Sequence, residues 1–168
     1  MKWLNKLLHI ATTEEQKGIS LKNPKWEISP IRDMPAFLRG LIGVIPEDSI
    51  LYLEGSSPDG EIASYLKERK ANKPIKIALG TIWPRPICYH MPFTSENVTG
   101  FAEIMEHHAT PEGAIHLHIY KNESIILEWH DAFYDDPMYI SEELEEEKIK
   151  EFCDKLSLKY KLITTQSS

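Results

Sequence analysis

Two runs of β-branched and aromatic residues form the strongest pattern of hydrophobic and polar positions in the chain. Residues 115–120 and 125–129 are dense in the residue types that suit a buried, pleated surface. The polar segment 121–124 between them is typical of a turn. We therefore predict a β-hairpin whose two-residue loop is Asn122-Glu123.

The register of this hairpin follows from its loop. Direct pairing outward from Asn122-Glu123 places His118 opposite Leu127 and His116 opposite Trp129. Directly opposed residues share a face of the sheet, so both histidines would face apolar partners. Because both faces are largely apolar, we expect the hairpin to lie in the middle of a sheet that is covered on both sides. The pairing depends on the turn, since a shift of one residue moves every side chain to the other face.

Hydrophobic periodicity predicts the remaining elements. Apolar stripes of helical spacing predict helices over residues 34–41, 58–70, 95–109 and 142–156, and extended apolar runs predict strands over residues 49–54, 74–79, 87–91 and 159–164. The residues expected to cap the helices are Asp33, Ser57, Thr94 or Ser95, and Ser141. These elements indicate an α+β fold with a mixed, mainly antiparallel sheet and helices packed on it. Their order also permits a split β-α-β, ferredoxin-like arrangement.

The chain length of 168 residues favours a single domain with an N-terminal extension. The apolar positions of residues 2–16 fall on one helical face, which predicts an amphipathic helix. Gly18, Pro24 and Pro30 mark the following segment as a linker. We therefore assign an N-terminal helix and linker to residues 1–32 and one α+β domain to residues 33–168.

Charge and cysteine content restrict the class of partner and the compartment. The net charge of −7 argues against nucleic acid and anionic membrane surfaces and suits a basic protein partner. Cys88 and Cys153 are far apart, which argues against a disulfide framework and favours a reduced, cytoplasmic protein. No apolar stretch approaches the length of a membrane span.

His116 and His118 would place two imidazoles on one strand face, a spacing that many metal sites use. A third ligand is missing from the pattern and would have to come from His90, His107, His108 or Asp131. In the simpler interpretation, the two histidines are packed or hydrogen-bonded under a helix.

His130 and Asp131, followed by Asp135 and Asp136, form the densest cluster of ionisable residues at a strand end. A carboxylate beside a histidine can orient it as a general base, which makes His130 and Asp131 the candidate catalytic residues. No activated nucleophile stands nearby in the sequence. The alternative is that these aspartates form turns and cap the next segment.

The segment 80–86, G-T-I-W-P-R-P, must be an extended loop because a residue before proline avoids the helical region. Trp and Arg are favoured at the centres of protein interfaces, so we select Trp83 and Arg85 as a protein-interaction loop. The alternative is that Trp83 folds back onto the sheet. The strand-to-helix turn over residues 55–60 could cradle an anion, but it lacks the established phosphate-binding patterns.

These observations favour a cytosolic protein-binding module without catalytic activity, such as an inhibitor, an immunity-type factor or an adaptor. No cofactor is expected under this hypothesis. The alternative is a metal-assisted hydrolase that uses a divalent metal with His116, His118, His130 and Asp131 on the 114–131 hairpin. A third hypothesis is a small-ligand sensor at the turn over residues 55–60. Whether the protein is an enzyme stays open at this stage.

Overall fold

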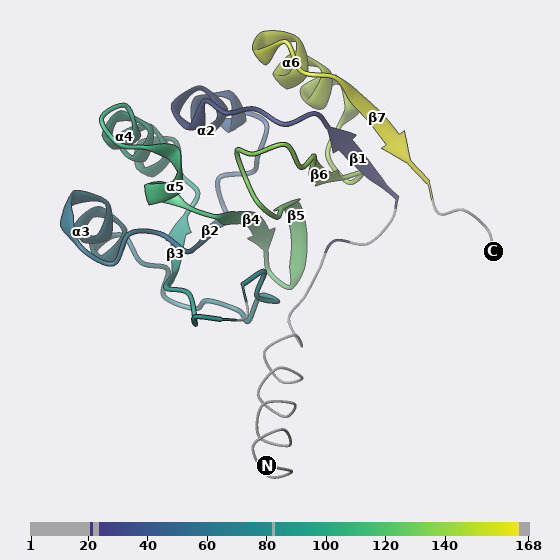
Figure 1. The fold of residues 1–168 in the computed structure, drawn as a ribbon. Helices are drawn as coiled ribbons and strands as arrows, with labels where there is room; N and C mark the ends of the chain where they lie inside the picture. The colour runs from purple at the N-terminus through teal and green to yellow at the C-terminus, as the bar shows by residue number, and fades with distance from the viewer. Residues whose placement is uncertain (1–20, 22–23, 82, 165–168) are drawn as a thin grey trace, which may run out of the picture.

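The structure, a computed structural model, describes residue 21, residues 24–81 and residues 83–164 (Figure 1). The strands are β1 (Lys25–Ile28), β2 (Ile50–Glu54), β3 (Cys88–Pro92), β4 (His116–Lys121), β5 (Ser124–Trp129), β6 (Met138–Ser141) and β7 (Tyr160–Ile163). The helices are α2 (Met34–Leu41), α3 (Gly60–Glu68), α4 (Ser95–Met105), α5 (Thr110–Gly113) and α6 (Glu146–Leu156). The helix expected over residues 2–16 lies outside the described residues.

The strands form one seven-stranded sheet in the order β3-β2-β4-β5-β6-β1-β7. Every pair of neighbouring strands is antiparallel. The predicted α+β class with a mainly antiparallel sheet is therefore confirmed, and the hairpin β4-β5 lies near the middle of the sheet as expected. No helix in the described ranges combines the length and the apolar character needed to cross a membrane.

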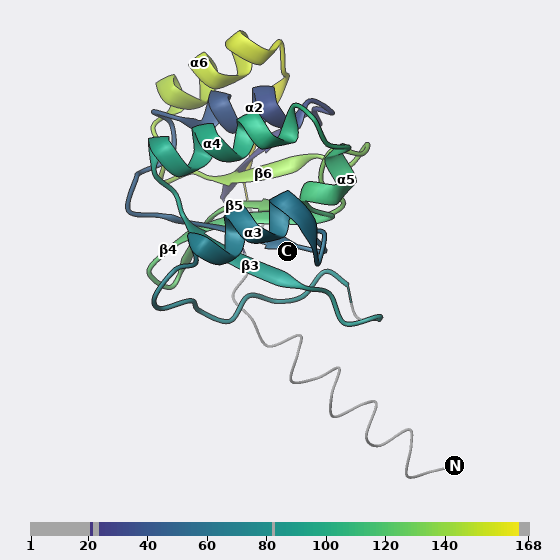
Figure 2. The same ribbon diagram turned by 90° about the vertical axis from the view of Figure 1, so that its left-hand side faces the viewer.

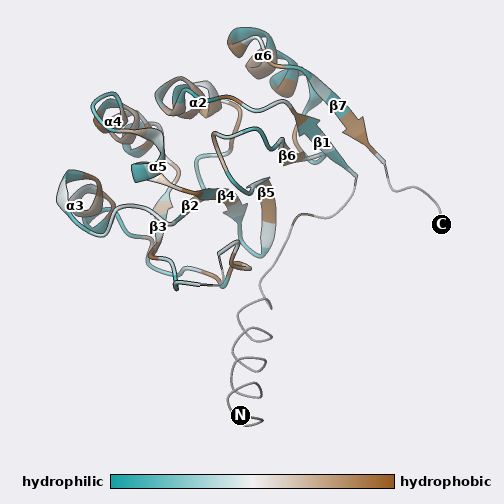
Figure 3. Cartoon of the chain, viewed as in Figure 1, coloured by the Kyte–Doolittle hydropathy of each residue, from teal (hydrophilic) through white to brown (hydrophobic). Residues whose placement is uncertain are grey.

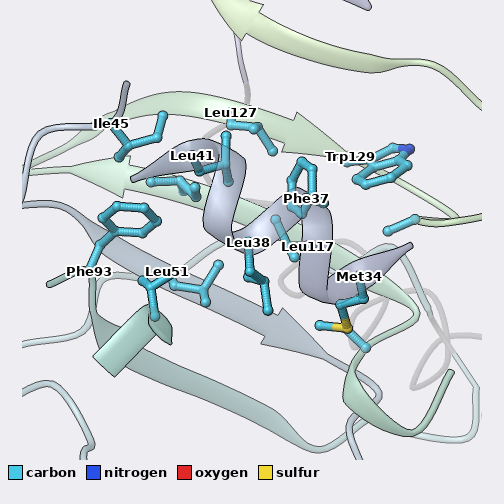
Figure 4. Packing of buried hydrophobic residues seen from close by; sticks show 14 of the residues in the cluster. Met34, Phe37, Leu38, Leu41, Ile45, Leu51, Phe93, Leu117, Leu127 and Trp129 are labelled. Atoms are coloured by element: carbon cyan, nitrogen blue, oxygen red, sulfur yellow. The ribbon is translucent and has the colours of Figure 1, made fainter. Parts of the chain in front are cut away.

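The described helices all cover one face of the sheet, and residues 69–81 and 83–87 run along the other face (Figures 1 and 2). Hydrophobic and hydrophilic residues alternate around the helices, as expected for elements with one buried side (Figure 3). The centre of the core is α2, whose apolar side chains lie over the central strands (Figure 4). Its fully buried residues are Met34, Phe37, Leu38 and Leu41. The predicted cap is confirmed, because the Asp33 carboxylate accepts a hydrogen bond of 2.9 Å from Ala36 N.

The register of the hairpin differs from the prediction beyond its turn. Tyr120 pairs with Ile125 as the two-residue loop requires, but Ile119 then pairs with Leu127. Ile126 is thus an extra residue in β5, a β-bulge that moves the following residues to opposite faces. Leu127 and Trp129 consequently face the helices, and Glu128 lies opposite His118. The predicted pairing of the histidines with Leu127 and Trp129 is wrong.

Residues 74–79 do not form the expected strand, apart from an isolated bridge at Ile77. Ile77 instead packs against Tyr52, Tyr120 and Ile125 on the face opposite the helices. The connection from β2 through α3 to β3 joins antiparallel strands, so the order that was compared with a ferredoxin-like sheet is not adopted.

Two short strands lie where the sequence suggests connections. β1 falls within the expected linker and pairs with both β6 and β7, which buries Trp26 and Ile28. β6 follows the loop after the hairpin and ends at Ser141, which was expected to cap the last helix. That helix, α6, begins at Glu146 instead.

The start of α3 also differs from the prediction. The Ser57 amide donates to Glu112 O over 2.8 Å and the Ser56 hydroxyl donates to Gly113 O, so both serines are tied to α5. The helix therefore begins at Gly60 after Asp59, not at Pro58 after a Ser57 cap.

Candidate functional site

The sheet face opposite the helices carries a layer of ionisable and aromatic side chains, which we call the histidine face. Alternate residues of a strand share a face, so these positions follow from the two-residue period of β2, β3, β4 and β5. The histidine face consists of Tyr52, Glu54, Cys88, His90, His116, His118, Tyr120, Glu128 and His130. Opposed pairs within it include Tyr52 with His90, Glu54 with His116, and His118 with Glu128.

Glu54 is a fully buried carboxylate at the end of β2. It accepts hydrogen bonds from Tyr52 Oη at 2.9 Å, Gly80 N at 3.1 Å and Thr81 N at 2.6 Å. A buried carboxylate is tolerated only when such donors replace water. Glu54 therefore ties the start of the 80–86 loop to the sheet.

His116 lies beside this carboxylate, with Nε2 at 3.9 Å from Glu54 Oε1. Its Nδ1 accepts a hydrogen bond of 2.9 Å from Asp131 N, so the proton of the neutral ring sits on Nε2. That Nε2 lies 3.0 Å from the Thr81 hydroxyl, to which it donates. Burial lowers the pKa of His116 and keeps the ring neutral, although the charge of Glu54 acts to raise that pKa.

His118 is buried more deeply, with 1% of its surface exposed. Its Nδ1 accepts a hydrogen bond of 3.3 Å from Trp129 N, so Nε2 carries the proton here as well. The ring stacks on Tyr52 with centroids 5.5 Å apart, and Nε2 has no hydrogen-bond partner in the structure as described. Burial, reinforced by the nearby His130, lowers the pKa of His118 to about 3.

His130 lies edge-on to both rings, with centroid distances of 5.5 Å to His116 and 4.8 Å to His118. Its Nε2 is 3.7 Å from Glu128 Oε1, and this carboxylate raises the pKa of His130. The other oxygen of Glu128 accepts a hydrogen bond of 2.8 Å from Leu21 N. Like Glu54, Glu128 thus binds a backbone amide from outside the sheet, that of Leu21.

These tautomers argue against metal binding by His116 and His118. A metal-ligating imidazole offers one unprotonated nitrogen and usually donates its other N–H to an acceptor. In both rings the unprotonated Nδ1 already accepts a backbone N–H, and Nε2 is protonated. In the part of the chain that the structure describes, no three His, Cys, Asp or Glu side chains converge as a metal site would require. The histidines are hydrogen-bonded as the simpler interpretation expected. His116 lies against Gly80 and Thr81, on the sheet face opposite the described helices.

The carboxylate beside His130 is that of Glu128, whereas the carboxylate of Asp131 lies beside His116. His130 and Asp131 flank His116, and Asp131 Oδ1 lies 3.9 Å from His116 Nδ1. Asp135 forms an ion pair of 2.7 Å with Arg32, and the backbone oxygen of Asp136 accepts a hydrogen bond of 2.9 Å from Trp129 Nε1. Burial raises the pKa of the Cys88 thiol, so Cys88 is not an activated nucleophile.

Of the other candidate histidines, one lies on the histidine face and two lie beyond the end of α4. His90 joins the histidine face, where its Nδ1 lies 2.9 Å from Tyr120 Oη and burial lowers its pKa to about 4. His108 lies beyond the end of α4, between Glu61 and Glu112, and hydrogen bonds to these carboxylates raise its pKa. His107, also beyond the end of α4, is exposed.

The loop over residues 80–86 presents Trp83 to solvent. Trp83 is 85% exposed, more than any other large hydrophobic residue in the described ranges, and Ile87 is 41% exposed. Trp83 therefore does not fold back onto the sheet. The loop is held at both ends, since Glu54 binds its first two amides and Ile87 O accepts a hydrogen bond of 2.8 Å from Gly55 N.

The turn over residues 55–60 offers little to an anion. The amides of Gly55 and Ser57 already donate to Ile87 O and Glu112 O, both over 2.8 Å. The Glu54 carboxylate next to the turn would also repel a negative ligand.

Sequence reasoning missed Glu54 and Glu128. The signal for Glu54 was present, because Tyr52 and Glu54 alternate with the apolar Leu51 and Leu53 in β2. The signal for Glu128 was hidden by the bulge, which decides the face on which Glu128 lies.

Comparison with protein-family models, with curated proteins and with solved structures finds no match to this chain.

Proposed function

We propose that this protein is a protein-binding module that docks its partner through residues 80–87, with Trp83 at the centre of the contact. The observation that carries the proposal is the 85% exposure of an indole on a loop whose two ends are hydrogen-bonded to the sheet. Water-exposed indole is unfavourable unless another surface covers it, and Trp residues dominate the binding energy of many interfaces.

The surroundings of Trp83 support the same function. Arg85 is exposed on the same loop, and Ile87 adds apolar surface beside it. The net charge of −7 favours association with a basic partner. Both cysteines are free, which suits the cytoplasm, where thiols stay reduced.

The experiment compares capture of a partner by the wild-type chain, by Trp83→Ala and by Tyr134→Ala. Tyr134 is a matched control, because it is an aromatic residue that is 50% exposed on a different loop. A partner that binds through Trp83 should be retained by Tyr134→Ala and bound at least tenfold more weakly by Trp83→Ala. Equal affinity of the two variants in a titration with the purified partner would contradict the proposal.

The tautomers of His116 and His118 disfavour the alternative of a metal-assisted hydrolase on the 114–131 hairpin, which also has a separate test. Elemental analysis of protein purified without chelators would measure bound zinc, manganese and iron. Near-stoichiometric metal that is lost in His116→Ala would favour the hydrolase over the binding module.

A further inference from the structure

We infer that the buried Glu54 is a positioning residue for partner binding, because its carboxylate fixes the base of the loop that presents Trp83. The consequence for binding rests on the proposed function. The anchoring itself is a property of the free protein and can be measured without a partner.

The anchor consists of converging hydrogen bonds on two successive residues. Glu54 accepts the amides of Gly80 and Thr81, one on each carboxylate oxygen, at 3.1 Å and 2.6 Å. The Thr81 side chain is held independently, with its hydroxyl 3.0 Å from His116 Nε2. Hydrogen bonds to an ionised acceptor are stronger than neutral ones, and burial strengthens them further.

The approach of Gly80 to the sheet leaves no room for a side chain. A Cβ added to Gly80 would lie 2.5 Å from Cδ2 and 2.6 Å from Nε2 of His116. The loop therefore rests directly on the imidazole that faces the Glu54 carboxylate. Trp83 follows Thr81 by two residues in the sequence, so the indole and its anchor are close along the chain.

Anchoring matters for affinity because a loose loop must be ordered when it binds. A loop that is already held loses less conformational entropy in the complex. Glu54→Gln conserves the size of the side chain but replaces one acceptor oxygen with an NH2 group. That group faces a backbone N–H, so one of the two amides loses its acceptor.

Glu128→Gln provides a matched control. Glu128 lies on the same face and also accepts a backbone amide, but that amide belongs to Leu21 and not to the loop. Both variants remove one carboxylate that lies beside a histidine of the histidine face. Only Glu54→Gln removes an acceptor of the loop.

The experiment measures amide hydrogen exchange by NMR in the full chain, together with 19F spectra of 5-fluorotryptophan protein. The Trp83 resonance is assigned from Trp83→Phe. We expect Glu54→Gln to speed exchange of the Gly80 and Thr81 amides at least tenfold and to shift the Trp83 resonance. Glu128→Gln should leave both unchanged. Unchanged exchange in Glu54→Gln would overturn the inference.

Gly80→Ala tests the same anchor if Glu54→Gln does not fold. Its Cβ displaces the base of the loop from His116 while the carboxylate remains, and we expect the same faster exchange at Thr81. Unchanged exchange and an unshifted Trp83 resonance in this variant would also overturn the inference.

Capture of the partner then separates this inference from the proposed function. We expect Glu54→Gln to weaken capture at least threefold and Glu128→Gln to leave it unchanged. Suppose that Trp83→Ala abolishes capture, whereas Glu54→Gln speeds amide exchange in the loop and still binds normally. The positioning role of Glu54 is then wrong, and the proposed protein-binding function is retained. If Trp83→Ala binds normally, the proposed function fails, and amide exchange alone decides the anchoring.

Discussion

Lowering the pH from 7 to 5 should destabilise the fold, because the histidine face holds neutral imidazoles away from water. Burial lowers the pKa of His118 from 6.5 to about 3. Because the pKa of His118 is lower in the folded state than in the unfolded state, the neutral ring contributes its full stabilisation of the fold above pH 6.5. This stabilisation is lost as the pH falls from 6.5 toward 3. Protonation at Nδ1 would also replace the acceptor of the Trp129 amide with a second donor.

The size of the effect follows from the difference in proton binding between the folded and unfolded states. For a histidine with these two pKa values, proton uptake by the unfolded chain lowers the free energy of unfolding by about 2 kcal/mol between pH 7 and pH 5. His90 and His116 act in the same direction, because burial lowers the pKa of each. The titratable groups around His118 are Tyr52, Glu128, His116 and His130. Of these, His130 opposes the trend, since Glu128 raises its pKa.

Urea denaturation at pH 7, 6 and 5 measures this loss. With a slope of about 2 kcal/mol per molar urea, the midpoint should fall by about 1 M or more between pH 7 and pH 5. His118→Gln should remove about 2 kcal/mol of the pH dependence, whereas the exposed control His107→Gln should retain all of it. The reasoning is refuted if the wild-type midpoint is equal at pH 7 and pH 5, or if His118→Gln keeps the full dependence.

Two further predictions concern α2 and its contact with the sheet. Phe37→Ala should lower the free energy of unfolding by about 3–5 kcal/mol, because Phe37 is fully buried and its ring lies 5.1 Å from that of Trp129. Urea denaturation checks this, and an equal cost for the exposed Tyr134→Ala would contradict it. Asp33→Ala should cost about 1 kcal/mol by removing the cap of α2. Asp59→Ala should cost less than about 0.5 kcal/mol, since Asp59 makes no capping hydrogen bond with its side chain, and equal thermal shifts of the two variants would count against the capping argument.

Elements with local signals could be predicted from the sequence. The helix α2 has a capping aspartate, a proline in its first turn and an apolar stripe, and its predicted bounds agree with the structure. The edge strand β7 and the turn of the hairpin were likewise found near their predicted places. In each case the residues that define the element lie within a few positions of one another.

Elements that depend on distant partners could not be predicted. The alternating segment 74–79 reads as a strand, yet it lies across the histidine face and only Ile77 makes a bridge. β1 has four residues, too few for a periodic signal, and is fixed by pairing with β6 and β7. The role of Glu54 could not be predicted for the same reason, because its partner Gly80 comes 26 positions later in the chain.

The bulge at Ile126 connects the error in the register with the chemistry of the candidate site. In the bulged register, Glu128 shares the histidine face with His118, and Trp129 turns its side chain toward the helices. The backbone amides of Trp129 and Asp131 reach Nδ1 of His118 and His116, which fixes the proton of each ring on Nε2. Two histidines whose spacing suggests a metal site thereby carry their protons on Nε2, where a metal would need a free lone pair. His116 uses its Nε2 proton to hold Thr81, so the position of one extra residue in β5 also affects how firmly the loop with Trp83 is anchored.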